Sequence, residues 1–142
     1  LIDFAILGSA DHNMARAMVG DVESSFPSAM HSRYAMKMKQ WESRCDRHIK
    51  KDIGFVKGTI SHYWYGKKKD RRYVDRWKIL TGNNYDPDRD LKRDSQGLWV
   101  LTEDNIGLRD DIRAYFRARN EDSIDPLPLV LVPFRLRTRE KF

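Results

Sequence analysis

The chain has 142 residues, of which 40% are hydrophobic and 34% are charged, and its formal net charge is +6. These proportions fit one folded domain with a buried core and argue against an intrinsically disordered chain. The single cysteine, Cys45, excludes an intramolecular disulfide framework, and no apolar run approaches the roughly 20 residues of a membrane-spanning helix. We therefore expect a soluble, cytoplasmic protein whose positive charge favours an anionic partner.

Residues 1–7 are an apolar run that ends at Gly8, and the run predicts a strand. A chain that opens inside a strand, without methionine, is typical of a fragment of a longer protein, although a processed terminus would look the same. If the strand is exposed, its edge favours a homo-oligomer formed by strand pairing. The turn that follows predicts a helix from His12 to about Val19, capped by Asp11.

After a loop over residues 20–27, the longest helix is predicted over residues 29–50. Its apolar side chains recur at steps of three and four residues on one face: Met30, Tyr34, Met38, Trp41, Cys45 and Ile49. The thiol of Cys45 is therefore expected in the core and not as a nucleophile. Residues 55–65 predict one or two short strands, broken at Gly58.

The second half of the chain continues the mixture of helices and strands. A helix is predicted over residues 70–80, a polar loop over 84–97, a short strand over 98–102 and a last helix over 108–119. Side chains expected to face inward from these two helices are Tyr73, Trp77, Leu80, Leu108, Ile112, Tyr115 and Phe116.

The order of elements predicts an α/β fold, with a mixed short sheet and several long helices. One domain is expected over residues 1–125. A basic tail that contains prolines follows over residues 126–142 and suits an extended segment.

Residues 57–78 hold eight Lys or Arg and two Asp, so their charge equals that of the whole chain. On the predicted helix, Lys69, Arg72 and Arg76 would share one face. Gly66 permits a tight turn and close approach of a ligand, and a helix start adds N–H donors for an anion. Arginine forks bind phosphate bidentately, so the pattern predicts a phosphate or pyrophosphate site. A solvated basic face is the alternative interpretation.

Two further positions could carry chemistry. His62 lies in a predicted strand, where a neutral imidazole fits either a divalent-metal ligand or an ordinary core residue. Asp11 follows small residues at a strand-to-helix turn, where a carboxylate can act as general base toward a bound hydroxyl or can simply cap the helix. His12 is adjacent and could support either role.

Residues 86–90 contain the pattern Asp-x-Asp twice, and paired carboxylates at this spacing can hold Mg²⁺ or Mn²⁺. Here Arg89 and Lys92 lie close enough in sequence to neutralise the acids, and Pro87 interrupts the segment. The pattern therefore favours a surface turn.

Taken together, these motifs resemble the C-terminal half of nucleotide-sugar glycosyltransferases of the Rossmann-like A-type fold. The resemblance is closest to glycosyltransferase-like proteins of bacteriophages and marine metagenomes, and it extends over roughly residues 2–122. It is carried by the segments Leu7-Gly8-Ser9-Ala10-Asp11-His12-x-Met14-Ala15, Gly54-x-Val56-x-Gly58-Thr59-Ile60-x-His62-x-Trp64-x-Gly66, Arg72-Tyr73-x-x-Arg76-Trp77-x-Ile79-Leu80 and Tyr85-Asp86-Pro87-x-x-Asp90-Leu91.

The resemblance implies transfer of a sugar from a nucleoside diphosphate to a hydroxyl acceptor, with Mn²⁺ or Mg²⁺ as cofactor. It implies that Asp11 is the base or acceptor ligand and that His62 is a metal ligand. The residues implied to contact the diphosphate are Gly66, Lys67, Lys69, Arg72 and Arg76, and those on the acceptor side are His12 and Trp64. The family's nucleotide-binding half would precede these residues, so we expect the chain to be inactive by itself.

Two alternatives to an enzyme stay open. The basic residues 67–76, together with nearby aromatic residues, combine the cations and stacking surfaces that bind single-stranded nucleic acid: Tyr63, Trp64, Tyr65 and Tyr73. A structural or interaction protein of a phage, which docks an acidic partner on the basic face, is the third interpretation.

Overall fold

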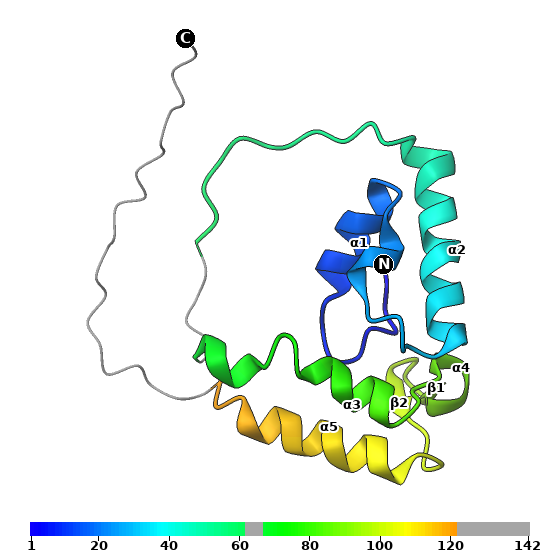
Figure 1. The fold of residues 1–142 in the computed structure, drawn as a ribbon, viewed down its shortest axis with the longest axis vertical. Helices are drawn as coiled ribbons and strands as arrows, with labels where there is room; N and C mark the ends of the chain where they lie inside the picture. Colours follow the sequence, from blue (N-terminus) through cyan, green and yellow to red (C-terminus); the bar gives the residue numbers. More distant parts are fainter. Residues whose placement is uncertain (62–66, 122–142) are drawn as a thin grey trace, which may run out of the picture.

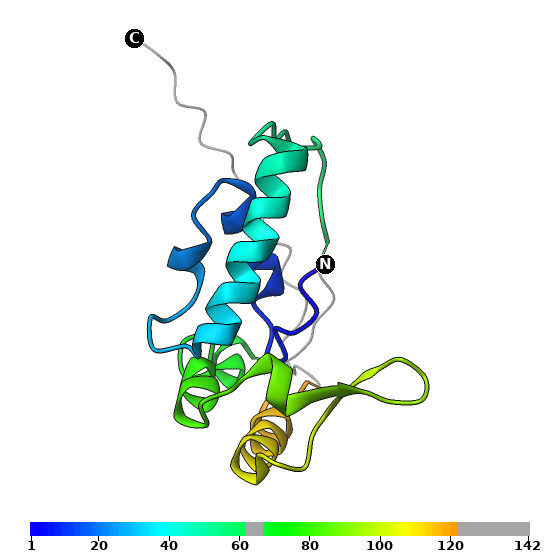
Figure 2. The same cartoon turned by 90° about the vertical axis from the view of Figure 1, so that its right-hand side faces the viewer.

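The computed structural model of the protein describes residues 1–61 and 67–121 (Figure 1). Its helices are α1 (Ala10–Met18), α2 (Ser32–Ile49), α3 (Arg76–Gly82), α4 (Pro87–Asp90) and α5 (Ile106–Ala118), with 3-10 turns η1 (Val22–Ser25) and η2 (Lys68–Arg71). The strands β1 (Leu91–Arg93) and β2 (Trp99–Leu101) pair antiparallel, with Lys92 opposite Val100. Figure 2 shows this hairpin projecting from the body of the molecule.

The prediction that helices are combined with a small sheet is confirmed. The described residues contain no parallel sheet, so the Rossmann-like arrangement stays a prediction. The helices predicted near the ends of the described chain are confirmed as α1 and α5, and the short strand predicted over residues 98–102 is confirmed as β2.

Tyr34 of α2 lies fully buried at the centre of the core. Four rings from other parts of the chain pack against it edge-on, with centroid distances from 5.4 to 6.4 Å: Phe4, Phe26, Trp77 and Tyr85. The apolar face predicted for α2 is confirmed, because Tyr34, Met38 and Cys45 are all buried. Edge-to-face aromatic pairs add to the free energy of simple apolar burial, so this cluster fixes α2 against the segments around it.

The N-terminal apolar run forms no strand, so that prediction is wrong. Ile2 and Leu7 are buried, and the Tyr85 hydroxyl donates a hydrogen bond of 2.8 Å to the Phe4 carbonyl oxygen. The run is apolar because it belongs to the core and not because it pairs in a sheet. Strand pairing between copies through residues 1–7 therefore loses its structural basis.

Residues 51–61 are exposed throughout, and Figure 1 shows them arching away from the C-terminal end of α2. Phe55, Val56 and Ile60 are 89%, 97% and 82% exposed. The strands predicted for residues 55–65 are absent from residues 55–61, and the remainder lie outside the described residues. The β-branched composition indicated a strand, but a strand needs a partner, and this segment pairs with no other described strand.

The basic residues of the predicted helix do not share one face. The turn η2 ends at Arg71, Arg72 adopts a left-handed conformation with φ 45°, and α3 begins only at Arg76. A positive φ at a non-glycine residue interrupts a right-handed helix, so the prediction of one basic face is wrong. Tyr73 and Phe116, which were expected inside, are 43% and 46% exposed.

The Asp-x-Asp motif is part of the scaffold. Asp86 caps α4 by accepting a hydrogen bond of 2.9 Å from the Asp88 N–H. Asp90 is only 1% exposed, and its carboxylate accepts hydrogen bonds from the Arg89 guanidinium and from the Asp86 N–H. The predicted surface turn is therefore wrong for Asp90, whose carboxylate oxygens are already engaged.

Replacement of Tyr34 by alanine should lower the free energy of unfolding by about 4 kcal/mol, because it leaves a cavity bordered by four rings. Urea denaturation measures this difference. The matched control is Phe116→Ala, which removes a ring that is 46% exposed and should cost about 1 kcal/mol. Equal losses for the two variants would contradict the central position of Tyr34.

Replacement of Asp90 by asparagine should lower stability by about 2 kcal/mol at neutral pH, because the buried network loses its negative charge and one of its two acceptor oxygens. Burial by itself raises the pKa of Asp90, but hydrogen bonds from Arg89 and Asp86 outweigh it and the net pKa is lowered. The ionised carboxylate therefore stabilises the fold above its unfolded-state pKa, and this contribution is lost as pH falls through the folded-state pKa. The stability difference between wild type and variant should thus shrink as the pH falls below about 4, the usual pKa of an aspartate. A difference independent of pH would contradict this account.

Candidate functional site

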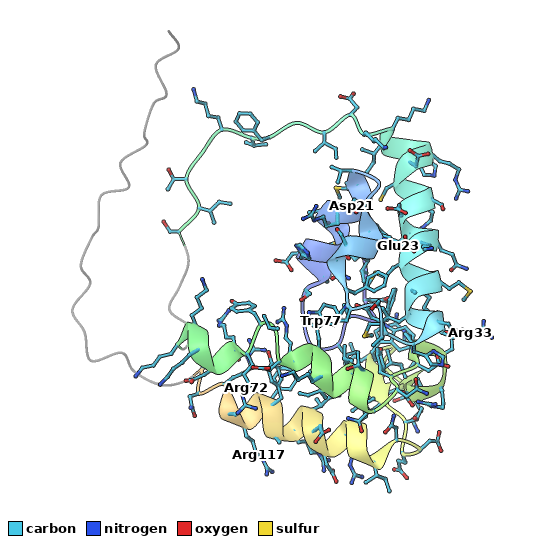
Figure 3. The ribbon with its side chains drawn as sticks, in the orientation of Figure 1. Asp21, Glu23, Arg33, Arg72, Trp77 and Arg117 are labelled. Carbon is cyan, nitrogen blue, oxygen red and sulfur yellow. The ribbon has the colours of Figure 1, made fainter. Side chains whose placement is uncertain are left out.

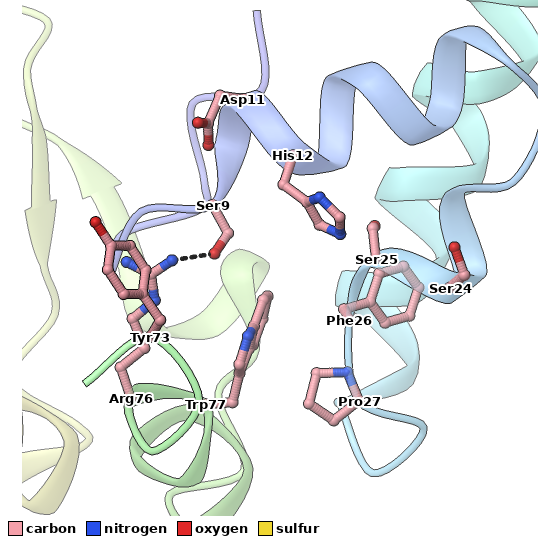
Figure 4. Close-up of a pocket in the computed structure, with 10 residues that line it drawn as sticks. All are labelled: Ser9, Asp11, His12, Ser24, Ser25, Phe26, Pro27, Tyr73, Arg76 and Trp77. Carbon is pink, nitrogen blue, oxygen red and sulfur yellow. Dashed lines mark hydrogen bonds between the residues drawn. The ribbon is translucent and has the colours of Figure 1, made fainter. Parts of the chain in front are cut away.

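A cleft of about 480 Å³ opens between the start of α1, the end of η1 and the start of α3 (Figure 4). It brings together three predicted site residues from distant parts of the sequence: Asp11, His12 and Arg76. Its other lining residues are Ser9, Ser24, Ser25, Phe26, Pro27, Tyr73 and Trp77.

Arg76 closes one end of the cleft. Its guanidinium donates a hydrogen bond to the Ser9 hydroxyl and lies 5.1 Å from the centroid of the Tyr73 ring. Among the described residues, no carboxylate forms an ion pair with Arg76. A partly buried guanidinium without an acidic partner in this part of the chain is well placed to bind an anion.

Gly8 lets the Arg76 side chain come close to the turn that precedes α1. Its φ is 90°, and a Cβ at this position would lie 2.9 Å from Nη1 of Arg76. The next residue, Ser9, also has a positive φ, of 71°. The backbone conformation therefore favours glycine at position 8, and an added Cβ would also displace the end of the Arg76 side chain.

Asp11 and His12 project from the first turn of α1, and both side chains are exposed. Figure 4 shows Asp11 beside Ser9, near the Arg76 end of the cleft, and His12 turned toward Ser25 and Phe26. The capping position belongs to Ser9, whose side chain makes no capping hydrogen bond, so the predicted Asp11 cap is wrong. The Asp11 carboxylate therefore lines the cleft as an exposed group and does not cap α1.

The other predicted anion-binding residues do not reach the cleft. Lys67 and Lys69 are exposed at η2. Arg72 lines a separate groove beside Ile79 and Tyr115, and Figure 3 shows it on the α5 side of the chain, whereas Trp77 lies on the side of α3 that faces α1. The predicted clamp is thus divided, with Arg76 inside the cleft and the other cations outside it.

Three predicted site residues, His62, Trp64 and Gly66, lie outside the described residues, so their roles stay predictions. Within residues 1–61 and 67–121, no group of three or more His, Cys, Asp or Glu side chains could hold a metal ion. The divalent cation therefore stays a prediction as well. In the same part of the chain, no helix is both long enough and apolar enough to cross a membrane.

Sequence reasoning missed the aromatic walls of the cleft. Trp77 was assigned to the core, which it does contact, but it also faces the cleft. Phe26 and Pro27 belong to a segment that was read only as a loop. Tertiary packing brings Phe26 and Pro27 into the same cleft as Asp11, and no local sequence pattern could predict this.

Comparison of the chain with protein-family models, curated proteins and solved structures gives no match.

Replacement of Gly8 by alanine should displace the Arg76 guanidinium and weaken binding of inorganic pyrophosphate by about tenfold, since a charge-assisted hydrogen bond is lost. Isothermal titration measures the affinity. The matched control is Gly97→Ala, which has a similar φ of 78° but no atom within 4 Å of the added Cβ. Both variants carry backbone strain, so equal affinities for pyrophosphate would contradict the role assigned to Gly8 and Arg76.

Proposed function

We propose that this chain forms the acceptor and leaving-group side of a glycosyltransferase, which moves a sugar from a nucleoside diphosphate to a hydroxyl group. The observation that carries the proposal is the placement of one carboxylate, Asp11, and one guanidinium, Arg76, beside Ser9 at the same end of one cleft. Glycosyl transfer to a hydroxyl needs one group of each kind, because a proton is removed from the acceptor while negative charge develops on the leaving group.

In the proposed reaction, the acceptor oxygen forms a bond to the anomeric carbon of the donor sugar. The bond between that carbon and the diphosphate oxygen breaks, and its electron pair leaves with the nucleoside diphosphate. Asp11 takes the proton of the acceptor hydroxyl. Arg76 binds the diphosphate and stabilises the charge that it gains.

The exposed cations outside the cleft have a longer-range role in this proposal. Lys67, Lys69 and Arg72 attract the nucleotide electrostatically, and this effect weakens as salt is added. A bound Mn²⁺ or Mg²⁺ would add further charge neutralisation, and the sequence predicts His62 as its ligand and Gly66 as a contact of the diphosphate.

Single-stranded nucleic acid is the competing ligand. The consecutive exposed lysines of residues 67–69 and the exposed ring of Tyr73 favour it. The cleft lining argues against it, because Arg76 is the one Lys or Arg among the described residues that line the cleft, and a continuous phosphate backbone is bound by several cations. The cleft therefore favours a small diphosphate ligand over a continuous phosphate backbone.

Replacement of Arg76 by glutamine should weaken UDP or GDP binding by about tenfold or more, because the guanidinium supplies charge-assisted hydrogen bonds to the diphosphate. Isothermal titration with and without Mn²⁺ measures the effect, and His62→Ala should remove any dependence on Mn²⁺. The matched control is Lys68→Gln, which removes one positive charge from η2, away from the cleft.

The control should lower nucleotide affinity by no more than about threefold. Equal losses in the Arg76 and Lys68 variants would contradict a site in the cleft. Tight, salt-sensitive binding of single-stranded DNA without preference for a nucleoside diphosphate would instead establish the competing function.

A further inference from the structure

The geometry of the cleft points to a sugar ring as the acceptor, bound between the side chains of Phe26 and Trp77. This inference rests on the proposed function, because it names the class of acceptor for the same cleft.

Two aromatic side chains form opposite walls of the cleft. Phe26 follows η1, Trp77 lies in the first turn of α3, and both are partly exposed in the cleft while they pack against the core. Figure 4 shows a space between the two rings, with Pro27 at one edge and His12 at the other. The cleft is therefore apolar on two sides and polar toward α1.

Both walls are held by the same buried residue. The Phe26 ring packs on Tyr34 at 5.6 Å with an interplanar angle of 80°, and the Trp77 ring packs on Tyr34 at 6.4 Å with an angle of 87°. Because Tyr34 is fully buried, neither wall can move far without disturbing the core. The space between the rings is thus formed before a ligand binds, which lowers the entropic cost of binding.

A pyranose ring fits this combination of surfaces. Its two faces carry C–H groups that gain from burial against aromatic rings, and its edge carries hydroxyl groups that need hydrogen-bond partners. Ser9, Asp11 and His12 offer polar groups toward that edge. The hydroxyls of Ser24 and Ser25 already donate hydrogen bonds to the carbonyl oxygens of residues 21 and 22. The hydrogen bonds to the sugar hydroxyls are therefore expected from the side chains of α1.

The two ends of the cleft then hold the two substrates of the proposed reaction. A sugar between Phe26 and Trp77 directs one hydroxyl along the cleft toward Asp11, while the diphosphate lies at Arg76. A nucleobase would also stack on aromatic rings, so uridine is the ligand against which the glycosides are compared.

The test is an NMR titration of the ¹⁵N-labelled chain with methyl α-D-glucopyranoside and methyl α-D-mannopyranoside, in parallel with uridine. The signal of the Trp77 indole N–H reports on the cleft. At least one glycoside should shift this signal saturably, and uridine should not. Phe26→Leu should weaken glycoside binding by about tenfold, whereas Phe26→Tyr, which keeps the ring, should retain it. Phe116→Leu is the matched control for an aromatic residue outside the cleft.

The inference is overturned if no glycoside shifts the Trp77 signal at the highest soluble concentration, or if uridine shifts it and the glycosides do not. It is also overturned if Phe26→Leu, with a native-like spectrum, binds glycosides as tightly as the wild type. Pyrophosphate binding separates this inference from the proposed function. A wild-type chain that binds pyrophosphate but no glycoside would refute the sugar site alone. A wild-type chain that binds glycosides but neither pyrophosphate nor UDP would refute the transferase and leave the sugar site standing.

Discussion

The packing of four aromatic rings around Tyr34 is the interaction on which the rest of the structure depends. Each ring attaches a different segment to Tyr34. These rings are Phe4 of the N-terminal run, Phe26 of the segment after η1, Trp77 at the start of α3 and Tyr85 of the segment before α4. Two of these rings also form walls of the cleft. The core and the candidate site therefore share side chains, and the geometry of the cleft is set by packing rather than by a flexible loop.

The sequence predicted correctly the helices whose formation depends on residues close together in the chain. The repeat of apolar side chains in α2 and α5 needs only helical geometry to create one buried face, and both helices form as expected. The apolar run over residues 1–7 was ambiguous, because a buried irregular segment and a buried strand have the same composition. The left-handed conformation of Arg72, which divides the basic segment, has no signature in residue type.

The residues of the candidate site also fall into two groups, those with a local sequence signal and those brought together only by tertiary packing. Asp11 and His12 were predicted as site residues because their motif is local, and Arg76 because positive charge is concentrated nearby in the sequence. The aromatic walls and the fit of Arg76 over Gly8 could not be found, since they join segments that are distant in sequence. Composition identified the Lys and Arg residues that could bind an anion. Only the tertiary structure shows that Arg76, of those in the described part of the chain, is the one that lines the cleft.

The central claim is that one cleft holds a diphosphate at Arg76 and a sugar ring between Phe26 and Trp77 at the same time. The most direct measurement is an isotope-filtered nuclear Overhauser experiment on the labelled chain with UDP and a methyl glycoside together. The account predicts cross-peaks from glycoside ring protons to both aromatic side chains, which persist while UDP shifts the Arg76 guanidinium signal. Displacement of the glycoside by UDP, or cross-peaks confined to residues outside the cleft, would contradict it.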